Sequence, residues 1–130
     1  MDKIQVQKVG SNTFWENSVG YSRAVRIGQY VEVAGTTAVQ GDQIIGQDDP
    51  FAQTVFVIKK IEKALHDLGA RLDHVIRTRI YVSNIDHWEM IGQAHGKFFS
   101  EIKPACTMIE VSRLIKAELL VEIEATAIIH

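Results

Sequence analysis

Glu122 is the residue of this chain best suited to acid or base chemistry. It lies in the segment from Leu119 to Ile128, in which apolar residues alternate with polar and charged ones. A carboxylate held on a partly apolar strand loses hydration, and this loss raises its pKa toward neutral pH. The same carboxylate could instead form an ion pair with Arg77 or Arg79, which alternate along an earlier predicted strand. The sequence leaves both roles open.

Cysteine and histidine give weaker signals. Cys106 is the single cysteine, so the chain forms no internal disulfide, and this composition fits a reducing compartment. A strand cysteine among apolar neighbours is usually inert and becomes a nucleophile only beside a base. The five histidines lack the spacing of a metal site, and His95 falls on an apolar helix face that favours a hydrogen-bonded core or interface residue. No glycine-rich phosphate loop is present, and we expect no cofactor.

The composition is that of one ordinary globular domain. The 130 residues are 46% hydrophobic and 23% charged, and the formal net charge of -2 gives no electrostatic reason to expect nucleic-acid binding. No stretch approaches the roughly 20 apolar residues that span a bilayer, and the N-terminus lacks the apolar run of a signal peptide. We therefore expect a cytoplasmic protein with neither a nucleic-acid nor a membrane partner.

Alternating patterns predict the strands that position these residues. A hairpin is expected through Gly28 and Gln29, with Val31 and Val33 facing the core. The C-terminal quarter is expected to form a strand pair. Its carboxylates would lie on or near one sheet surface: Glu110, Glu122 and Glu124. The predicted strands cover residues 4–8, 20–28, 30–35, 74–82, 104–114 and 119–128, and on the strand over 74–82 one face is expected to hold Ile76, Thr78, Ile80 and Val82.

Two helices are predicted. The first runs from about Phe51 to Leu68, with Asp49 as N-cap, Pro50 as first residue and Gly69 just after its end. Its lysines, including Lys59, Lys60 and Lys63, are expected on a solvated face. The second starts near Asp86, which forms the pattern of a capping box with Glu89, and its inner stripe is expected to hold Trp88, Ile91, Ala94, His95 and Phe98.

Helices gathered on one face of a mixed sheet indicate an α+β fold. The other face is expected to be too apolar for open water, which favours a closed homo-oligomer. Phe14 and Trp15 stand in a polar loop, where two aromatic side chains form either a lid on the core or a platform for a ligand. The residues expected on that second face are Tyr21, Arg77, Arg79, Met108 and Glu122.

Two C-terminal motifs resemble the signature of the RidA (YjgF/YER057c/UK114) family. The first reads Pro-Ala-x-Thr-x-Ile-Glu-Val-x-Arg-Leu from Pro104, and the second reads Val-Glu-Ile-Glu-Ala-Thr-Ala from Val121. The likeness extends over nearly the whole chain, through Gly20-Tyr21 and Val33-Ala34-Gly35 among others. It implies a chorismate-mutase-like α+β fold over residues 1–130, and a homotrimer with three ligand clefts between its subunits.

The resemblance also implies a chemistry. Family members hydrolyse reactive enamines and imines, such as 2-aminoacrylate, to keto acids and ammonia without a cofactor. By position, Glu122 would hold the water and Tyr21 would close the cleft. An arginine that normally grips the substrate carboxylate is replaced by Cys106. The residues implied for the small-molecule cleft are Tyr21, Ala34, Gly35, Gly92, Cys106 and Met108, with Glu122 as the catalytic residue.

Three departures indicate a divergent branch of the family. Besides Cys106, Ala34 stands where a serine is common and Gly92 where an asparagine is common. Two functions stay open: a deaminase-like hydrolase, and a non-catalytic small-molecule binding or protective trimer. The ribonuclease activity attached to some relatives is disfavoured because the chain is slightly acidic. The cations considered as replacements for the missing arginine are Arg23, Arg79 and Lys116.

Overall fold

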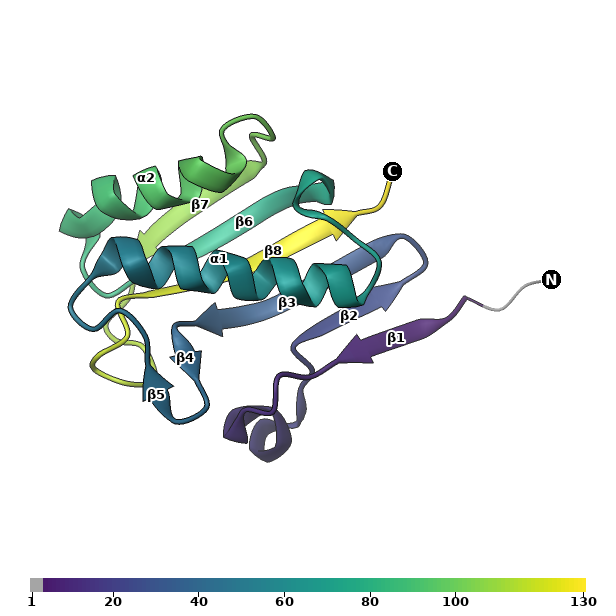
Figure 1. Cartoon of the computed structure of the whole chain (residues 1–130), viewed down its shortest axis with the longest axis horizontal. Coiled ribbons are helices and arrows are strands. Elements are labelled where there is room, and N and C mark those ends of the chain that lie inside the picture. Colours follow the sequence, from purple (N-terminus) through teal and green to yellow (C-terminus); the bar gives the residue numbers. More distant parts are fainter. Residues whose placement is uncertain (1–3) are drawn as a thin grey trace.

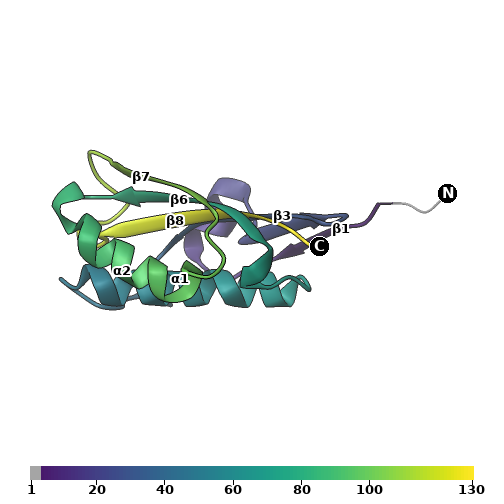
Figure 2. The same ribbon diagram turned by 90° about the horizontal axis from the view of Figure 1, so that it is seen from above.

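A computed structural model describes residues 4–130. It shows a six-stranded sheet with two long helices packed on one face (Figures 1 and 2). The opposite face, which neither of these two helices covers, is named the helix-free face. The α+β prediction is confirmed. The elements are β1 (Val6–Val9), η1 (Glu16–Gly20), β2 (Ala24–Ile27), β3 (Tyr30–Thr37), β4 (Val39–Gln40), β5 (Gln43–Ile44), α1 (Pro50–Asp67), η2 (Leu72–His74), β6 (Val75–Val82), η3 (Ile85–His87), α2 (Trp88–Phe99), β7 (Ala105–Glu110) and β8 (Val121–Ile128).

The strand order across the sheet is β1-β2-β3-β8-β6-β7. All neighbours are antiparallel except β6 and β7, which are parallel and joined through α2. Strands β4 and β5 form a separate small hairpin. Within residues 4–130, no helix is both long enough and apolar enough to cross a membrane.

The local predictions around β2, β3 and α1 are confirmed. β2 and β3 form the expected hairpin, with Gly28 at a φ of +60° in its turn and Val31 and Val33 buried. Asp49 caps α1 by accepting a hydrogen bond from the amide of Ala52 at 2.9 Å. At the other end, Gly69 has a φ of +81°, a left-handed conformation that glycine adopts without steric cost.

The predicted pairing of the last two strands is wrong. Strand β6 lies between β7 and β8, so those two strands are not neighbours. A parallel partner needs a long crossover, and α2 supplies it by carrying the chain from the end of β6 back to the start of β7. The loop of residues 111–120 then returns the chain to β8.

Two face assignments near the sheet edge are also corrected. Met108 lies beside Ile80, and Glu110 beside Val82, on the face that packs against the helices. Met108 is therefore half-buried against the core, and Glu110 does not share a surface with Glu122.

At the start of β6, an irregularity in the pairing with β8 buries Val75 and leaves Ile76 44% exposed, which is the reverse of the predicted alternation.

The start of α2 differs from its prediction. The predicted Asp86 cap is not formed: α2 begins at Trp88 after His87, which makes no side-chain capping hydrogen bond. The capping side chain belongs to the preceding short helix η3, where Asn84 accepts from the amide of Asp86 at 2.9 Å. Trp88, predicted for the inner stripe, is 55% exposed. His95 is a hydrogen-bonded residue as expected, with its Nε2 at 2.9 Å from the Thr78 hydroxyl.

Candidate functional site

Glu122 lies on the helix-free face of β8, opposite Thr37 of β3 and Tyr81 of β6. The pairing of β3 with β8 shifts between Val33 and Thr36, and Gly35 lies inside this shift. A Cβ atom at Gly35 would overlap the Glu122 carboxylate. Glycine therefore lets the carboxylate lie directly against the β3 backbone.

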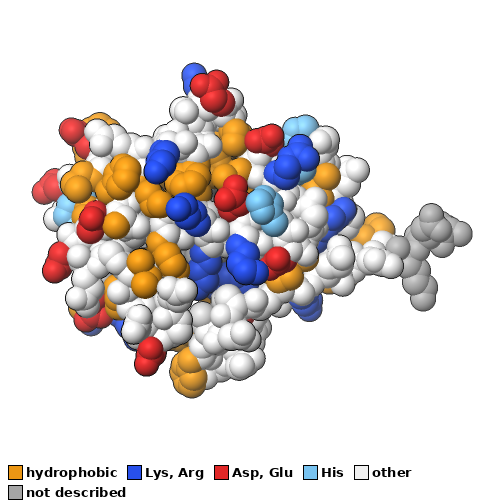
Figure 3. All heavy atoms as spheres, in the orientation of Figure 1, with side chains coloured by type: hydrophobic (Ala, Val, Ile, Leu, Met, Phe, Trp, Pro, Cys, Tyr) orange, Lys and Arg blue, Asp and Glu red, His pale blue; other side chains and the backbone are white. Residues whose placement is uncertain are grey.

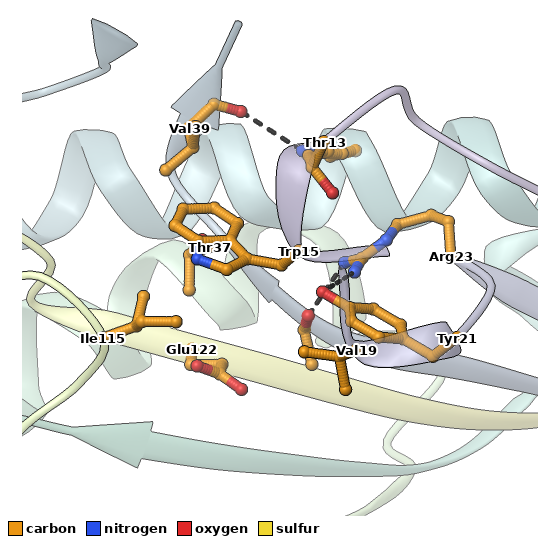
Figure 4. Close-up of a pocket in the computed structure, with 11 residues that line it drawn as sticks. Thr13, Trp15, Val19, Tyr21, Arg23, Thr37, Val39, Ile115 and Glu122 are labelled. Atoms are coloured by element: carbon orange, nitrogen blue, oxygen red, sulfur yellow. Dashed lines mark hydrogen bonds between the residues drawn. The ribbon is translucent and has the colours of Figure 1, made fainter. Parts of the chain in front are cut away.

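Arg23 immediately precedes β2, extends toward this carboxylate (Figure 4) and is only 5% exposed. Its Nη1 donates to the carbonyl oxygen of Gly35 and to the hydroxyl of Thr36, both at 2.8 Å. Its Nη2 makes a long contact of 3.5 Å with the hydroxyl of Tyr21, whose ring centre lies 5.6 Å from the guanidinium carbon. Strand β3 thus holds Arg23 through Nη1, by one backbone carbonyl and one side-chain hydroxyl, while Nη2 makes only the long contact with Tyr21.

The pKa of Glu122 is raised above its ordinary value. Burial of the carboxyl group is the largest cause; Arg23 acts against it, and the nearby charge of Glu124 adds to it. Within residues 4–130, Glu122 forms no ion pair, because Arg79 lies 3.7 Å from Glu124 and Arg77 donates to Thr107. Glu122 is therefore a carboxyl group that accepts a proton more readily than a surface glutamate.

A cavity of about 160 Å³ lies in front of Glu122. Figure 4 shows Trp15, Tyr21 and Arg23 above the strand that carries Glu122. Three predicted site residues meet here: Tyr21, Gly35 and Glu122. The other residues that line the cavity are Thr13, Trp15, Val19, Arg23, Thr37, Val39, Lys60 and Ile115.

The two aromatic residues and the three candidate cations differ in whether they line the cavity. Trp15 lines the cavity, whereas Phe14 is 77% exposed. Lys116 lies 5.7 Å from the centre of the Trp15 ring, and Arg79 is paired with Glu124. Arg23 is the candidate cation that lines the cavity itself.

Lys60 is a cavity residue that the sequence placed wrongly on the solvated face of α1. It is half-buried, and its Nζ donates to the carbonyl oxygen of Val39 at 3.2 Å. Burial lowers its pKa, nearby Arg23 lowers it further, and Glu16 acts in the opposite sense. The helical pattern could not predict the burial of Lys60, because the cavity wall beside it is formed by β4 and the N-terminal segment, which are distant from Lys60 in the sequence.

Glu16 fixes the N-terminal segment over the cavity. It is 7% exposed, and its carboxylate accepts from the amide of Ser11 at 2.9 Å, from the Ser11 hydroxyl, and from the Thr13 hydroxyl at 2.8 Å. Its Oε2 also lies 3.5 Å from Nε of Arg23. Burial would raise the pKa of Glu16, but the hydrogen bonds from Ser11 and Thr13, with Arg23, outweigh it and lower the pKa.

The remaining predicted site residues lie outside this cavity. Ala34 is the neighbour of Gly35 in β3. Cys106 is exposed on the edge strand β7 beside Thr78, and Met108 follows it on the same face. Gly92 is half-buried on α2. A single chain therefore brings Tyr21, Arg23 and Glu122 together at the cavity. Gly92, Cys106 and Met108 lie outside it, and β7 is two strands away from β8, which carries Glu122.

A metal centre has no support in the described part of the chain. Among residues 4–130, no group of three or more histidine, cysteine, aspartate or glutamate residues is arranged to hold a metal ion. The chemistry available in the cavity is that of one carboxyl group with a raised pKa, the phenol of Tyr21 and two cations, Arg23 and Lys60.

Comparison with known proteins agrees with this architecture. The chain is 36% identical to an uncharacterized protein of Streptomyces coelicolor over 127 residues, covering 98% of this chain and 95% of that one. It is 33% identical over 108 residues to a RutC family protein of Pyrococcus abyssi, covering 82% and 84%.

A crystal structure of a YjgF/YER057c/UK114 family member from Mycobacterium tuberculosis has a TM-score of 0.88 and 46% identity, covering 96% of this chain and all of that one. A Rid family protein of unknown function from Yersinia pestis has a TM-score of 0.84 and 26% identity, covering 96% and 100%. The family model described as Endoribonuclease L-PSP matches residues 14–129. With the fold, the cavity and these matches in agreement, the chain belongs to the RidA (YjgF/YER057c/UK114) family.

Proposed function

We propose that this protein hydrolyses reactive enamines or imines to a carbonyl compound and ammonia, with Glu122 as the residue that holds and activates water. The observation that carries the proposal is the half-buried Glu122 carboxyl group, which has a raised pKa and lies against Gly35 at the wall of a cavity. A catalytic acid or base works best when its pKa is near the operating pH. Burial moves Glu122 in that direction.

The hydrolysis balances with one carboxyl group. An enamine first takes a proton on carbon to become an iminium ion. Ionised Glu122 accepts a proton from water as the water oxygen bonds to the iminium carbon, which gives a carbinolamine. Protonated Glu122 then donates to the nitrogen. As the carbon–nitrogen bond breaks and ammonia leaves, the hydroxyl proton passes to solvent, which replaces the proton that solvent supplied to carbon, and a carbonyl group remains. Glu122 returns to its ionised state.

The neighbours of Glu122 have positioning roles in this proposal. Nη1 of Arg23 is occupied by Gly35 and Thr36, so Nη2 is the part of the guanidinium that can reach a polar ligand group. Tyr21 closes the cavity beside it. Arg23 would then supply the cation that the family places at the position of Cys106.

The proposed cleft lies between subunits of a homotrimer. Gly92, Cys106 and Met108 do not reach the cavity of their own chain, but β7 is a sheet edge that a second subunit can approach. The helix-free face also exposes large apolar side chains, including Tyr30 at 47% and Ile109 at 46%. Association over this face would bury them and bring the β7 side of one subunit to the cavity of the next.

Ammonia release from freshly generated imines tests the activity. The panel contains substrates with and without a carboxylate, because Cys106 cannot form the bidentate hydrogen bonds of an arginine. The proposal expects rates above buffer for part of the panel. A protein that gives no rate above buffer with any substrate contradicts it.

A second candidate function is non-catalytic binding of a small metabolite. The observation in its favour is that Ala34, Gly92 and Cys106 offer no charged or hydroxyl group where relatives often do. Thermal-shift screening with keto acids and small aromatic compounds would then find ligands that are never turned over. Cys106→Arg separates the two functions: restored gripping of a carboxylate should raise turnover of 2-aminoacrylate in a hydrolase and leave a pure binding protein inactive.

A further inference from the structure

A second cavity lies between α1 and the N-terminal segment that precedes η1. Its volume is about 480 Å³, three times that of the cavity in front of Glu122. Val9 and Phe56 give it apolar walls, and Lys59, Lys60 and Lys63 line it from α1. Glu122 does not line this second cavity.

Positive charge dominates this cavity although the whole chain carries a net charge of -2. Four cationic side chains line it: Arg23, Lys59, Lys60 and Lys63. Asp67 is the one carboxylate among the lining residues, and it lies 2.9 Å from Nζ of Lys63. Figure 3 shows Lys and Arg side chains gathered in the middle of the face that α1 covers.

Lys60 is the member of this group that is partly buried without a counter-ion. It is half-buried, its described hydrogen bond goes to the Val39 carbonyl oxygen, and it has no ion pair within residues 4–130. Burial and the neighbouring Arg23 both lower its pKa, which means that the surroundings disfavour its positive charge. An anion in the cavity would relieve this unfavourable state, because a partly buried charge is stabilised by a partner of opposite sign.

We propose that the second cavity binds a small organic oxyanion, a carboxylate or a phosphate monoester with a compact apolar body. The oxyanion lies between the ammonium groups of Lys59 and Lys60, and the apolar body lies against Phe56 and Val9. Lys60 and Arg23 line both cavities, so they form the partition between this site and the one that holds Glu122. The site does not depend on the proposed hydrolase activity.

Isothermal titration of the full chain with phenyl phosphate, benzoate and neutral benzyl alcohol tests this site. At least one anion is expected to bind, with benzyl alcohol weaker by about tenfold or more. Tighter binding of phenyl phosphate identifies the preferred oxyanion as a phosphate, and tighter binding of benzoate identifies it as a carboxylate. Binding should weaken as salt is added, since the site is partly open to solvent.

Variants assign the binding to the second cavity. Lys60→Met is expected to weaken anion binding about tenfold, and Lys60→Arg is expected to retain it. Lys97→Met removes an exposed lysine of α2 and serves as the matched control with unchanged binding. Lys59→Met should also weaken binding, and it assigns the anion to the second cavity, because Lys59 is exposed and lines the second cavity but not the one in front of Glu122. It also replaces Lys60→Met if that variant does not fold.

Glu122→Gln separates the two proposals. It should leave the affinity for the anion unchanged while it abolishes ammonia release. The second site is overturned if neither anion binds, if benzyl alcohol binds as tightly, if Lys60→Met binds like the parent, or if Glu122→Gln loses the anion. An adventitious surface interaction would show itself as equal weakening by Lys97→Met and Lys60→Met, which also overturns the proposal.

Discussion

Gly35 and Glu122 are matched to each other at the scale of single residues. Adding a methyl group at Gly35 would force the Glu122 carboxylate away from the β3 backbone. The family motif identifies both residues in the sequence, but it does not explain why glycine is needed. The structure supplies the reason, which is steric.

Gly35→Ala is therefore expected to reduce turnover by about 100-fold, the order of loss that follows from displacing a reacting group by an ångström. Steady-state ammonia release measures the effect. Gly96→Ala is the matched control, because a Cβ atom there meets nothing within 4 Å. The control should keep full activity and gain roughly 0.5–1 kcal/mol of stability as an alanine within a helix. Equal activity of the two variants would refute the steric account.

The raised pKa of Glu122 predicts how stability depends on pH. The native state holds this proton more tightly than the unfolded chain, so stability falls as pH rises from the ordinary glutamate range through the native pKa. Glu122→Gln lacks this titration and should therefore be more stable than the parent at neutral pH. A tenfold difference in proton affinity between the native and unfolded states corresponds to about 1.4 kcal/mol. Thermal unfolding at several pH values tests this: the two proteins should converge in acid, and a difference that does not change with pH contradicts the assignment.

The element that closes the cavity is η1 with the residues just before it. The sequence indicated a polar loop with two aromatic side chains, and only the tertiary structure shows that Glu16 ties this loop to Arg23. A contact of this kind joins two side chains without any repeating sequence pattern, so the sequence alone cannot predict it. The α1 helix, in contrast, was predictable because its cap, first proline and terminal glycine act locally.

Glu16→Gln is expected to cost about 1–3 kcal/mol, since a buried network of hydrogen bonds to a charged group loses its charge. Denaturant unfolding measures the change, and Glu101→Gln, at an exposed position, is the control with little effect. The pKa of Glu16 is lowered, so its contribution is complete above the ordinary glutamate pKa and is lost as pH falls through the native pKa. A cost that persists unchanged in strong acid would argue against the network.

The order of strands in the sheet could not be predicted from sequence patterns. Alternation identified β6, β7 and β8 as strands, but it carried no information on which strand lies between the other two. The crossover through α2 decides this, and it also moves Met108 and Glu110 to the helix-bearing face. The site is affected in the same way: motifs identified Tyr21, Gly35 and Glu122, whereas Trp15 and Lys60 reach the cavity through tertiary packing alone.

The proposed ligand cleft lies between subunits, so the whole molecule must be a trimer for the hydrolase to work as proposed. Light scattering coupled to size exclusion should return three times the chain mass of 14.6 kDa. Ile109→Asp places a charge on the helix-free face at the β7 edge, and it is expected to dissociate the trimer and abolish turnover together. Ile4→Asp, at a position that is 72% exposed ahead of β1, should do neither. A parent protein that runs as a monomer with full activity would exclude the intersubunit cleft.

The role of Glu122 in hydrolysis is tested by comparing ammonia release by the parent and by Glu122→Gln over the same imine panel and across pH. The parent should exceed the buffer rate, and its rate should fall as Glu122 is protonated at a pH above the ordinary glutamate range. Glu122→Gln should fall to the buffer rate while remaining folded. Equal rates for the two proteins would contradict the role of Glu122 in hydrolysis.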